Sequence, residues 1–297
     1  MALITLVRSR EEQLNASDLA ARALRERRSV APMSEDTWIR VSSVGGMCPR
    51  EEVLCAKHNV VREDIFDGYV GINFQMGNAI HWMMQNKVLA PTGKIIGSWR
   101  CTYCGETYGS RAARLVPRPE SCLRCGAIAG DAPRVDGRPV DGAQPNAFLY
   151  VEEWLGDSEF KIGGSPDGQL VYGDPNEYSA EDLVLLEFKS ANDRNFYKYK
   201  NAPDFMHAIQ TQVYMWLTGC KRAKIIYFNK NFSPSDQMPF HEHDFDYDPD
   251  VIERVKGLVR QIREGVTGGP VPVRTVCAVR SCFRAGKCQV ADVCFGS

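Results

Sequence analysis

Apolar residues recur along the chain at two different spacings, and each spacing predicts a different kind of element. Alternating or short apolar runs predict strands at 147–155, 159–163, 168–172, 182–189 and 223–229. Apolar residues at helical spacing predict helices at 10–29, from about 49 to 58, and at 71–90, 204–218 and 249–264. The second half of the chain therefore follows a β-β-β-α-β order before its last helix.

Two of these helices place polar side chains beside an apolar stripe. The stripe of the helix at 71–90 consists of Ile80, Met83, Met84 and Val88. His81 lies close to that stripe. The stripe of the helix at 204–218 consists of Ile209, Val213, Trp216 and Leu217, and another face carries His207, Gln210 and Tyr214. This second face either reaches a phosphate or orders a neighbouring strand, or it is an ordinary solvated helix face.

Length and charge restrict the class of protein. A chain of 297 residues forms one large domain or one domain with appendages. Its net charge of −1 gives no general attraction for nucleic acid, so such a partner has to be held by a local basic channel and by metal ions. No apolar run is long enough to span a membrane, and the first residues become charged too early for a secretory signal. These features predict a cytoplasmic protein with no membrane partner.

The eleven cysteines are clumped, and in a cytosolic chain they are expected to be metal ligands rather than disulfides. The first group is Cys101, Cys104, Cys122 and Cys125. Its two C-x2-C pairs lie seventeen residues apart, and each runs into a glycine, which is zinc-ribbon spacing. Redox-active or unrelated cysteines are the alternative. Five arginines surround the group, so the ribbon either contacts nucleic acid or carries a solvated basic loop. Cys55 and Cys220 are interpreted as ordinary core or surface cysteines.

The strand at 182–189 carries a carboxylate and an amine on one face. Glu187 and Lys189 share that face because side chains alternate along a strand. A structural ion pair is the simplest explanation of this arrangement. However, Asp167 precedes it by twenty residues in a Gly/Pro turn, so two carboxylates can share one hard cation beside a lysine. Glu152 or Glu153 is a possible further carboxylate on the preceding strand.

Four short motifs together resemble a known family. They are Gly77-x3-His81, Gly164-x2-Asp167, Glu187-x-Lys189 and Gln210-x3-Tyr214. In this order they are similar to the PD-(D/E)XK nuclease superfamily, specifically its RecB-like exonuclease branch, over roughly residues 42–295. The resemblance implies an α/β fold of the restriction-endonuclease type, with a mixed central β-sheet flanked by helices.

The resemblance also implies roles for these residues. Mg²⁺ or Mn²⁺ is bound by His81, Asp167, Glu187 and the backbone carbonyl of Phe188. Lys189 positions or helps deprotonate the attacking water, and a neighbouring cation makes this lysine easier to deprotonate. Gln210 and Tyr214 support the site or contact the DNA backbone.

The cysteines of the tail lack the paired spacing of a zinc site. They are Cys277, Cys282, Cys288 and Cys294. Similar tails in AddB-type and CRISPR-associated exonucleases hold a [4Fe–4S] cluster together with an early cysteine, here Cys48 of a Cys-Pro-Arg run. By this resemblance the ligands are Cys48, Cys277, Cys288 and Cys294, with Cys282 as the alternative to Cys277. Zinc at this site, or a disordered tail, is the other possibility.

These expectations divide the chain into four parts. Residues 1–40 form a peripheral helical segment, 41–98 and 146–270 the nuclease core, 99–145 the zinc ribbon with a loop, and 271–297 the tail. The expected activity is a metal-dependent DNA nuclease, an exonuclease on single-stranded ends in bacterial or phage recombination, repair or replication. A helicase or recombination protein is the expected partner. The aromatic and basic run at 195–200 either steers a single strand or packs into the core. The alternatives are a catalytically idle DNA-binding scaffold and a structure-specific endonuclease.

Overall fold

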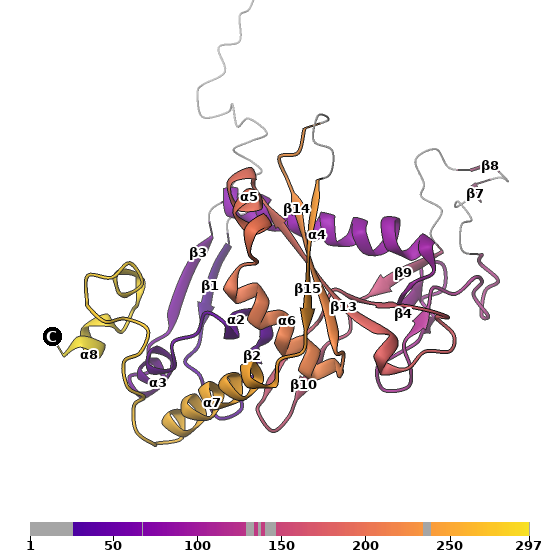
Figure 1. The fold of residues 1–297 in the computed structure, drawn as a ribbon. Helices are drawn as coiled ribbons and strands as arrows, with labels where there is room; N and C mark the ends of the chain where they lie inside the picture. Colours follow the sequence, from indigo (N-terminus) through magenta and orange to yellow (C-terminus); the bar gives the residue numbers. More distant parts are fainter. Residues whose placement is uncertain are drawn as a thin grey trace, which may run out of the picture.

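The fold is built on one mixed β-sheet (Figure 1), and the computed structural model describes residues 26–66, 68–128, 134–135, 138–139, 147–233 and 239–296. Its eight strands follow the order β15-β14-β13-β12-β4-β5, with β6 and β9 also paired to β4. They are β4 (Ile95–Cys101), β5 (Thr107–Tyr108), β6 (Val116–Pro117), β9 (Phe148–Val151), β12 (Gly168–Val171), β13 (Leu183–Ala191), β14 (Arg222–Asn229) and β15 (Phe240–Asp246). Strands β13 and β14 run parallel and the other pairs antiparallel, so the predicted mixed sheet is confirmed.

Helices cover both faces of β13 because its residues are apolar on both sides. On one face, Leu186 and Phe188 pack against α4 (Gly68–Met83) and the π-helical turn η1 (Met84–Leu89) that continues it. On the other face, Leu185 packs in a cluster with α6 (Phe205–Thr218) and α7 (Pro249–Val266). None of the helices that the structure describes combines the length and the apolar composition needed to cross a membrane.

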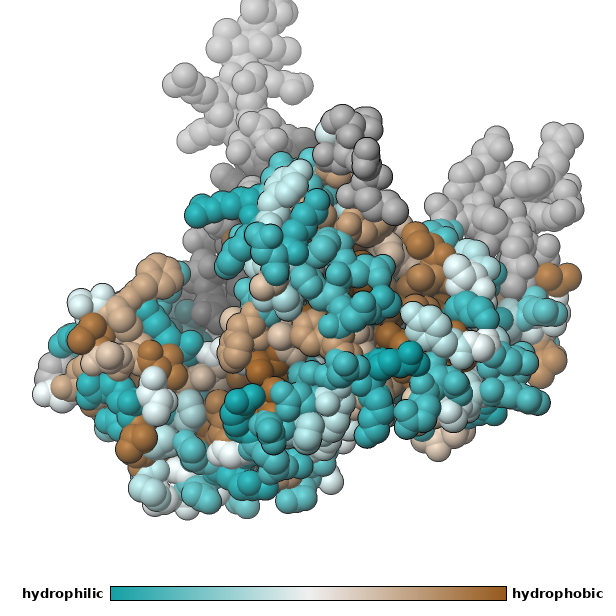
Figure 2. Space-filling model, in the orientation of Figure 1, coloured by the Kyte–Doolittle hydropathy of each residue, from teal (hydrophilic) through white to brown (hydrophobic). Residues whose placement is uncertain are grey.

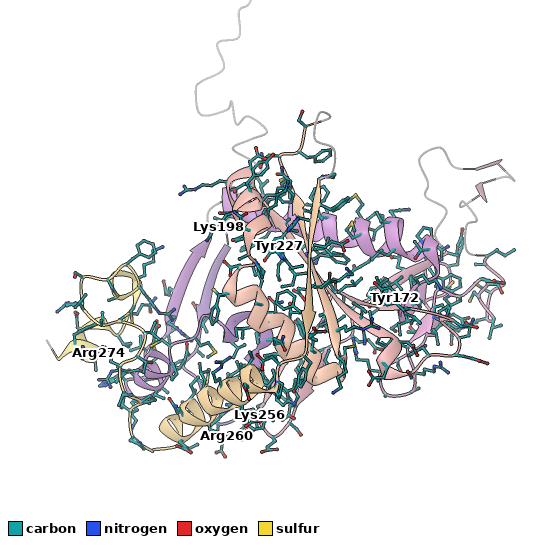
Figure 3. The ribbon with its side chains drawn as sticks, viewed as in Figure 1. Tyr172, Lys198, Tyr227, Lys256, Arg260 and Arg274 are labelled. Atoms are coloured by element: carbon teal, nitrogen blue, oxygen red, sulfur yellow. The ribbon has the colours of Figure 1, made fainter. Side chains whose placement is uncertain are left out.

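Local signals explain where the main helices begin and end. Asp204 accepts a hydrogen bond from the amide of Met206 at the start of α6, and Gly219 ends that helix in a left-handed conformation. Figure 3 shows Lys256 and Arg260 on α7, where they cover the ring of Phe160, and the surface over this helix in Figure 2 is largely hydrophilic. The apolar face of α7 is thus buried and its charged face is solvated.

Shorter elements complete the fold. A three-stranded sheet joins β10 (Leu155–Asp157), β11 (Ile162–Gly164) and β2 (Ile39–Arg40), and β1 (Glu26–Val30) pairs with β3 (Arg62–Phe66). A further pair joins β7 (Arg134–Val135) to β8 (Arg138–Pro139). The remaining helical pieces are α2 (Val41–Val44), α3 (Pro49–Lys57), η2 (Ala90–Thr92), η3 (Ala180–Asp182), α5 (Asp193–Asn201), η4 (Ala285–Lys287) and α8 (Ala291–Phe295).

Several expectations from the sequence are corrected by these elements. The helix predicted at 10–29 is wrong for residues 26–29, which belong to β1 and pair with β3; residues 10–25 lie outside the described residues. The boundary predicted between 98 and 99 cuts through β4, where buried Trp99 belongs to the core. Val88 is exposed rather than part of the apolar stripe, because the helix widens into a π-helical turn before it. The sequence reading also missed β15 and α5.

Candidate active site

The four motifs lie on four different elements that meet around the middle of β13. Asp167 lies in the turn between β11 and β12, and its Oδ2 accepts a hydrogen bond of 2.6 Å from the amide of Phe188. Gly164 begins this turn and lies close to α6. A Cβ added there would lie 2.7 Å from the hydroxyl oxygen of Tyr214, so a larger residue does not fit without movement. The turn therefore holds the buried Asp167 against β13.

Three groups able to bind a metal ion come together here. Ligand atoms of His81, Glu152 and Asp167 all lie within 4.8 Å of one another, and His81 Nδ1 is 3.1 Å from Asp167 Oδ1. Burial opposes protonation of His81, but the charges of Asp167 and Glu187 outweigh it and raise its pKa. Of the two glutamates that the sequence leaves open, Glu152 is the one that points to this cluster. Glu153 instead accepts a hydrogen bond from the amide of Arg111.

Glu187 is the most buried carboxylate of the site, with 2% of its side chain exposed. Its Oε1 accepts hydrogen bonds from Lys189 Nζ at 2.6 Å and from Gln210 Nε2 at 2.7 Å. Among the described residues, its Oε2 is buried without a hydrogen-bond partner. Burial, with a smaller effect of Asp167, raises the pKa of Glu187 to about 7. A buried oxygen without a donor is costly unless a cation satisfies it, so the donor set fits a divalent metal ion.

Lys189 is held in place by two oxygens. Its Nζ donates to Glu187 Oε1 and, at 3.0 Å, to Gln210 Oε1. Burial lowers its pKa, but Glu187 and Asp167 outweigh this effect, so with only protein charges nearby the pKa of Lys189 is raised. The easier deprotonation predicted from the sequence requires the charge of a metal ion, and it stays a prediction. Burial also raises the pKa of the Tyr214 hydroxyl.

The structure adds one residue that the sequence reading missed. Gln85 is buried on the π-helical turn, and its Nε2 donates to Glu152 Oε1 at 2.6 Å and to the backbone carbonyl of Asp167 at 2.8 Å. It therefore fixes two of the carboxylate-bearing segments to each other. Its position four residues after His81 was the available signal, because such residues lie on one helix face.

Some of the predicted residues play other parts in the structure. His207 contacts the hydroxyl of Tyr227 at 3.0 Å rather than the site. Phe188 supplies its amide to Asp167, and metal binding by its carbonyl stays a prediction. The run at 195–200 forms most of α5, with Phe196 in the core and Tyr197 exposed, so core packing is confirmed for Phe196 and the steering of a single strand stays a prediction.

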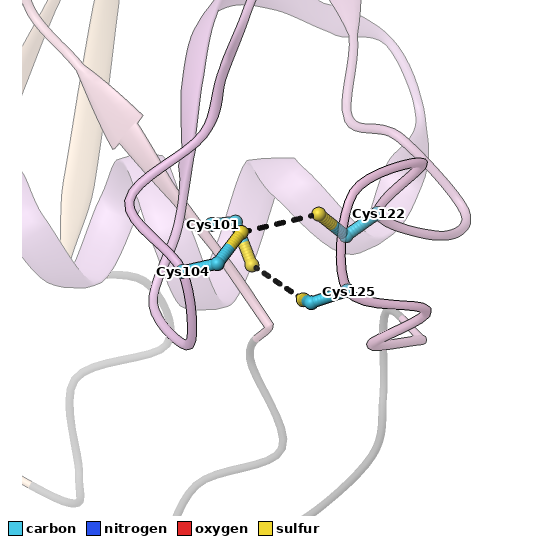
Figure 4. Close-up of side chains that lie close together, drawn as sticks. All are labelled: Cys101, Cys104, Cys122 and Cys125. Atoms are coloured by element: carbon cyan, nitrogen blue, oxygen red, sulfur yellow. Dashed lines mark hydrogen bonds between the residues drawn. The ribbon is translucent and has the colours of Figure 1, made fainter.

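The first cysteine group converges as its spacing predicts (Figure 4). All four sulfurs lie within 4.8 Å of one another, with Cys101 Sγ 3.7 Å from Cys125 Sγ and Cys104 Sγ 3.5 Å from Cys122 Sγ. Four thiolates around one tetrahedral zinc ion, at Zn–S of about 2.3 Å, would lie roughly 3.8 Å apart. The geometry therefore fits a metal ion bound by four cysteines.

Backbone turns shape each half of this quartet. Gly105 and Gly126 adopt φ of 76° and 74°, and their amides donate to the carbonyls of Cys101 and Cys122. Burial opposes the thiolate of Cys122, but hydrogen bonds from Tyr108 and from backbone amides outweigh it and lower its pKa to about 6. A thiolate is the form that binds metal, so the turns and Tyr108 prepare this ligand.

The arginines around this quartet are mostly engaged with the protein itself. Arg124 pairs with Glu106, and Arg114 lies over the ring of Tyr178. Arg111 reaches the core, where Nη1 donates to Gln169 Oε1 at 2.9 Å. Arg111 is therefore part of the fold, whereas Arg114 and Arg124 are exposed and remain compatible with a solvated basic surface.

The tail cysteines surround a small cavity together with Cys48. Four thiols line it, from Cys48, Cys277, Cys288 and Cys294, whereas Cys282 does not. Burial raises the pKa of Cys48, and that of Cys288 to about 11. Among the described residues these sulfurs do not form a quartet within 4.8 Å, as the ribbon sulfurs do. Binding of an iron–sulfur cluster in this cavity stays a prediction.

Arginine side chains accompany the tail cavity. Arg50 Nε donates to Cys294 Sγ at 3.2 Å, and its Nη1 donates to the carbonyl of Pro272. Arg274 and Arg284 also line the cavity, and Figure 3 shows Arg274 in the tail, where it lies over the ring of Phe295. These cations offset the negative charge that a thiolate-bound cluster would bring.

No family model and no curated protein matches the chain. Among solved structures, it is similar to an alkaline exonuclease (LHK-Exo) from Laribacter hongkongensis, with TM-score 0.41 and 15% identity over 77% of this chain and 88% of the other. The same exonuclease in complex with dAMP gives TM-score 0.42 and 14% identity over 78% and 89% of the two chains. A phage related exonuclease from Haemophilus somnus 129PT gives TM-score 0.38 and 13% identity over 78% and 94%. Likenesses this loose identify no function, so the geometry of the site has to carry the argument.

Proposed function

We propose that this protein is a metal-dependent DNA nuclease that acts as an exonuclease on single-stranded ends. One observation carries the proposal: Glu187 is buried with an oxygen that no described group satisfies, beside the cluster of His81, Glu152 and Asp167. An ion pair with Lys189 uses only Oε1, so a purely structural pair leaves Oε2 unexplained. A divalent cation bound among these groups accounts for it.

The chain supplies the groups that phosphodiester hydrolysis requires. A bound Mg²⁺ or Mn²⁺ would lower the pKa of a water molecule and neutralise charge on the phosphate. Asp167, Glu187, His81 and Glu152 would hold the ion, with the carbonyl of Phe188 as a further ligand. Lys189 would orient the attacking water, because Glu187 and Gln210 fix its ammonium group. Tyr214 and Gln210 would support the strand or contact the DNA backbone.

The two cysteine groups have structural parts in this proposal. The quartet at 101–125 would hold zinc, and four thiolates leave no open position for catalysis. The cavity lined by Cys48, Cys277, Cys288 and Cys294 would hold a [4Fe–4S] cluster that clamps the tail onto α3. Recombination, repair or replication in bacteria or phage is the expected setting, since free DNA ends arise there.

The decisive experiment compares wild type with Asp167→Ala and Lys189→Ala. The anaerobically purified proteins are incubated with end-labelled single- and double-stranded DNA and Mg²⁺ or Mn²⁺. We expect a loss on the order of 10³-fold in both variants, because each removes a group that acts on developing charge. Asp244→Ala, which changes an exposed carboxylate on β15, is the matched control and should keep full activity. Equal rates in wild type and Asp167→Ala, or no hydrolysis by either, would contradict the proposal.

A further inference from the structure

Two tryptophans form an exposed pair beside the candidate active site. Trp38 has 40% and Trp154 has 57% of its surface exposed, and their rings meet edge to face with centroids 4.8 Å apart. Large aromatic side chains are mostly buried in soluble proteins, so two exposed rings that contact each other are unusual. Neither indole belongs to any of the motifs described above.

The sheet beneath this pair has glycines at the positions that the two rings cover. Gly156 of β10 lies opposite Gly163 of β11, so both glycines are on the same face. A Cβ at Gly163 would lie 2.2 Å from Trp154 Cζ2, and a Cβ at Gly156 would lie 2.6 Å from Trp38 Cζ3. Side chains at these positions would push the rings away. The two glycines therefore form a floor that fixes the indoles in place.

One member of the pair, Trp154, is adjacent in the chain to a candidate metal ligand. Exposure alternates through Glu152, Trp154 and Gly156, which indicates that these residues lie on one face of an extended segment. Glu152 belongs to the candidate metal cluster, so Trp154 lies two extended residues, roughly 7 Å along the chain, from a metal ligand. On the neighbouring strand, Gly163 leads directly into the turn that carries Asp167. The pair thus flanks the place where a phosphate would bind.

Basic side chains continue from the pair along an open cleft of about 700 Å³. Trp38 lines this cleft together with Arg40, which lies opposite Gly163, and with Lys287 of the tail. Among the described residues, no acidic side chain forms an ion pair with Arg40 or Lys287. Of the acidic residues lining the cleft, Glu52 pairs with Arg62 and Glu51 with Arg284 outside it. The basic side chains lining the cleft therefore exceed the acidic ones by one, three against two, and a positively charged groove next to aromatic rings is the arrangement that binds single strands.

We propose that Trp38 and Trp154 form a stacking platform for the bases of a single nucleic-acid strand, with the basic cleft holding the phosphates that follow. This inference rests on the proposed nuclease function and adds where the strand lies. Stacking accepts any base, because every base offers a π-face. The platform would therefore hold a strand in register with the metal site without selecting its sequence.

The test separates binding from hydrolysis. Fluorescence anisotropy of end-labelled oligo(dT) is followed while the full-length protein is added in Ca²⁺ in place of Mg²⁺. We expect binding by wild type, binding on the order of tenfold weaker in Trp154→Ala and in Trp38→Ala, and near-normal binding in Trp154→Phe. Tyr172→Ala, an exposed aromatic after β12, is the matched control and should bind normally. Thermal denaturation shows whether each variant is folded.

A second substrate keeps this inference distinct from the proposed function. Bis(p-nitrophenyl) phosphate is a small diester without bases, so Trp154→Ala should hydrolyse it at the wild-type rate with Mn²⁺ while its KM for oligo(dT) rises. Hydrolysis of DNA by wild type with unchanged oligo(dT) binding in both alanine variants would overturn the platform and leave the nuclease intact. Oligo(dT) binding that depends on Trp154 in a protein that hydrolyses neither substrate would support the platform and reject the nuclease.

Discussion

The ribbon at residues 101–125 and the tail at 277–294 each gather four cysteines, but in the described parts of the chain only the ribbon draws four sulfurs within 4.8 Å of one another. Ribbon residues Cys101 and Cys122 are buried among Trp99 and Phe148. The tail thiols are half-buried and surround a cavity at the surface of α3. One cysteine group is thus part of a hydrophobic core, and the other joins two distant parts of the chain.

Because one cysteine group lies in a core and the other at the surface, we expect them to contribute differently to the stability of the fold. The ribbon core continues into β4, the strand on which β5, β6, β9 and β12 all pair, so loss of its metal reaches the central sheet. The apolar contact of the tail with the rest of the molecule is small, with Val290 of the tail packed against Leu54 and Cys55 of α3. We therefore expect the ribbon metal to stabilise the fold and the tail cluster to hold the end of the chain in place.

The largest expected effect is that of Cys122→Ser. It removes a thiolate from the proposed zinc site and places a hydroxyl in a buried position, so we expect zinc to be lost and the melting temperature to fall by roughly 10 °C. Elemental analysis and thermal denaturation measure both changes. Cys220→Ala changes a buried cysteine outside both groups and should keep its zinc. A Cys122→Ser protein that retains stoichiometric zinc would contradict the assignment.

A smaller effect is expected from Cys288→Ser in the tail. Loss of this ligand should remove the brown colour and the iron, while the melting temperature falls by only about 5 °C because few core residues pack on the tail. Cys55→Ala, in the same apolar cluster, should keep its iron. Cys282→Ser should also keep it, since Cys282 does not line the cavity. A colourless wild-type protein with two zinc ions per chain would show instead that the two regions bind the same metal.

The ribbon also differs from the tail in reaching toward the active site, through Arg111. Its backbone amide donates to Glu153, and its Nη1 donates to Gln169, two residues after Asp167. We expect Arg111→Met to lower kcat on DNA by about tenfold, with zinc content and KM unchanged, because the carboxylate segments lose a support. Arg111→Lys, which keeps the charge but not the planar fork, should recover only part of kcat. A rise in KM with unchanged kcat would indicate a DNA contact instead.

The parts of the molecule that could be predicted are those whose roles follow from residues close to one another in the sequence. The ribbon quartet follows from two C-x2-C pairs with glycines, and the shared face of Glu187 and Lys189 follows from strand alternation. Strand β15 reads as polar because it carries alternating charged and histidine residues at the edge of the sheet, so no apolar pattern revealed it. Helix α5 was missed because its short aromatic and basic run buries only Phe196.

Contacts between distant segments limited the prediction of the site. Alternation could not decide between Glu152 and Glu153, since the choice depends on how their segment lies against α4. Gln85 belongs to a π-helical turn, and nothing in its immediate neighbours shows that it bridges Glu152 to the backbone of Asp167. The tryptophan pair depends on two glycines that meet only when β10 and β11 pair. Pairing across strands, rather than residue type, decided each of these cases.

The smallest expected effect concerns Arg50, which ties α3 to the tail without being a ligand. Its guanidinium donates to Cys294 Sγ and to the carbonyls of Pro272 and Cys294. We expect Arg50→Gln to lower the melting temperature by about 2–4 °C and to speed loss of iron in air, with iron content after anaerobic purification unchanged. Limited proteolysis should cut the variant after residue 270 sooner than wild type. Arg274→Gln is the comparison variant, and it removes a stacking contact with Phe295 and one hydrogen bond to Cys294. Both contacts lie within the tail, so the link to α3 stays intact and the resistance to proteolysis should change less. If Arg50→Gln resists proteolysis as wild type does, then the cluster alone holds the tail, and the contrast with the core-embedded ribbon becomes sharper.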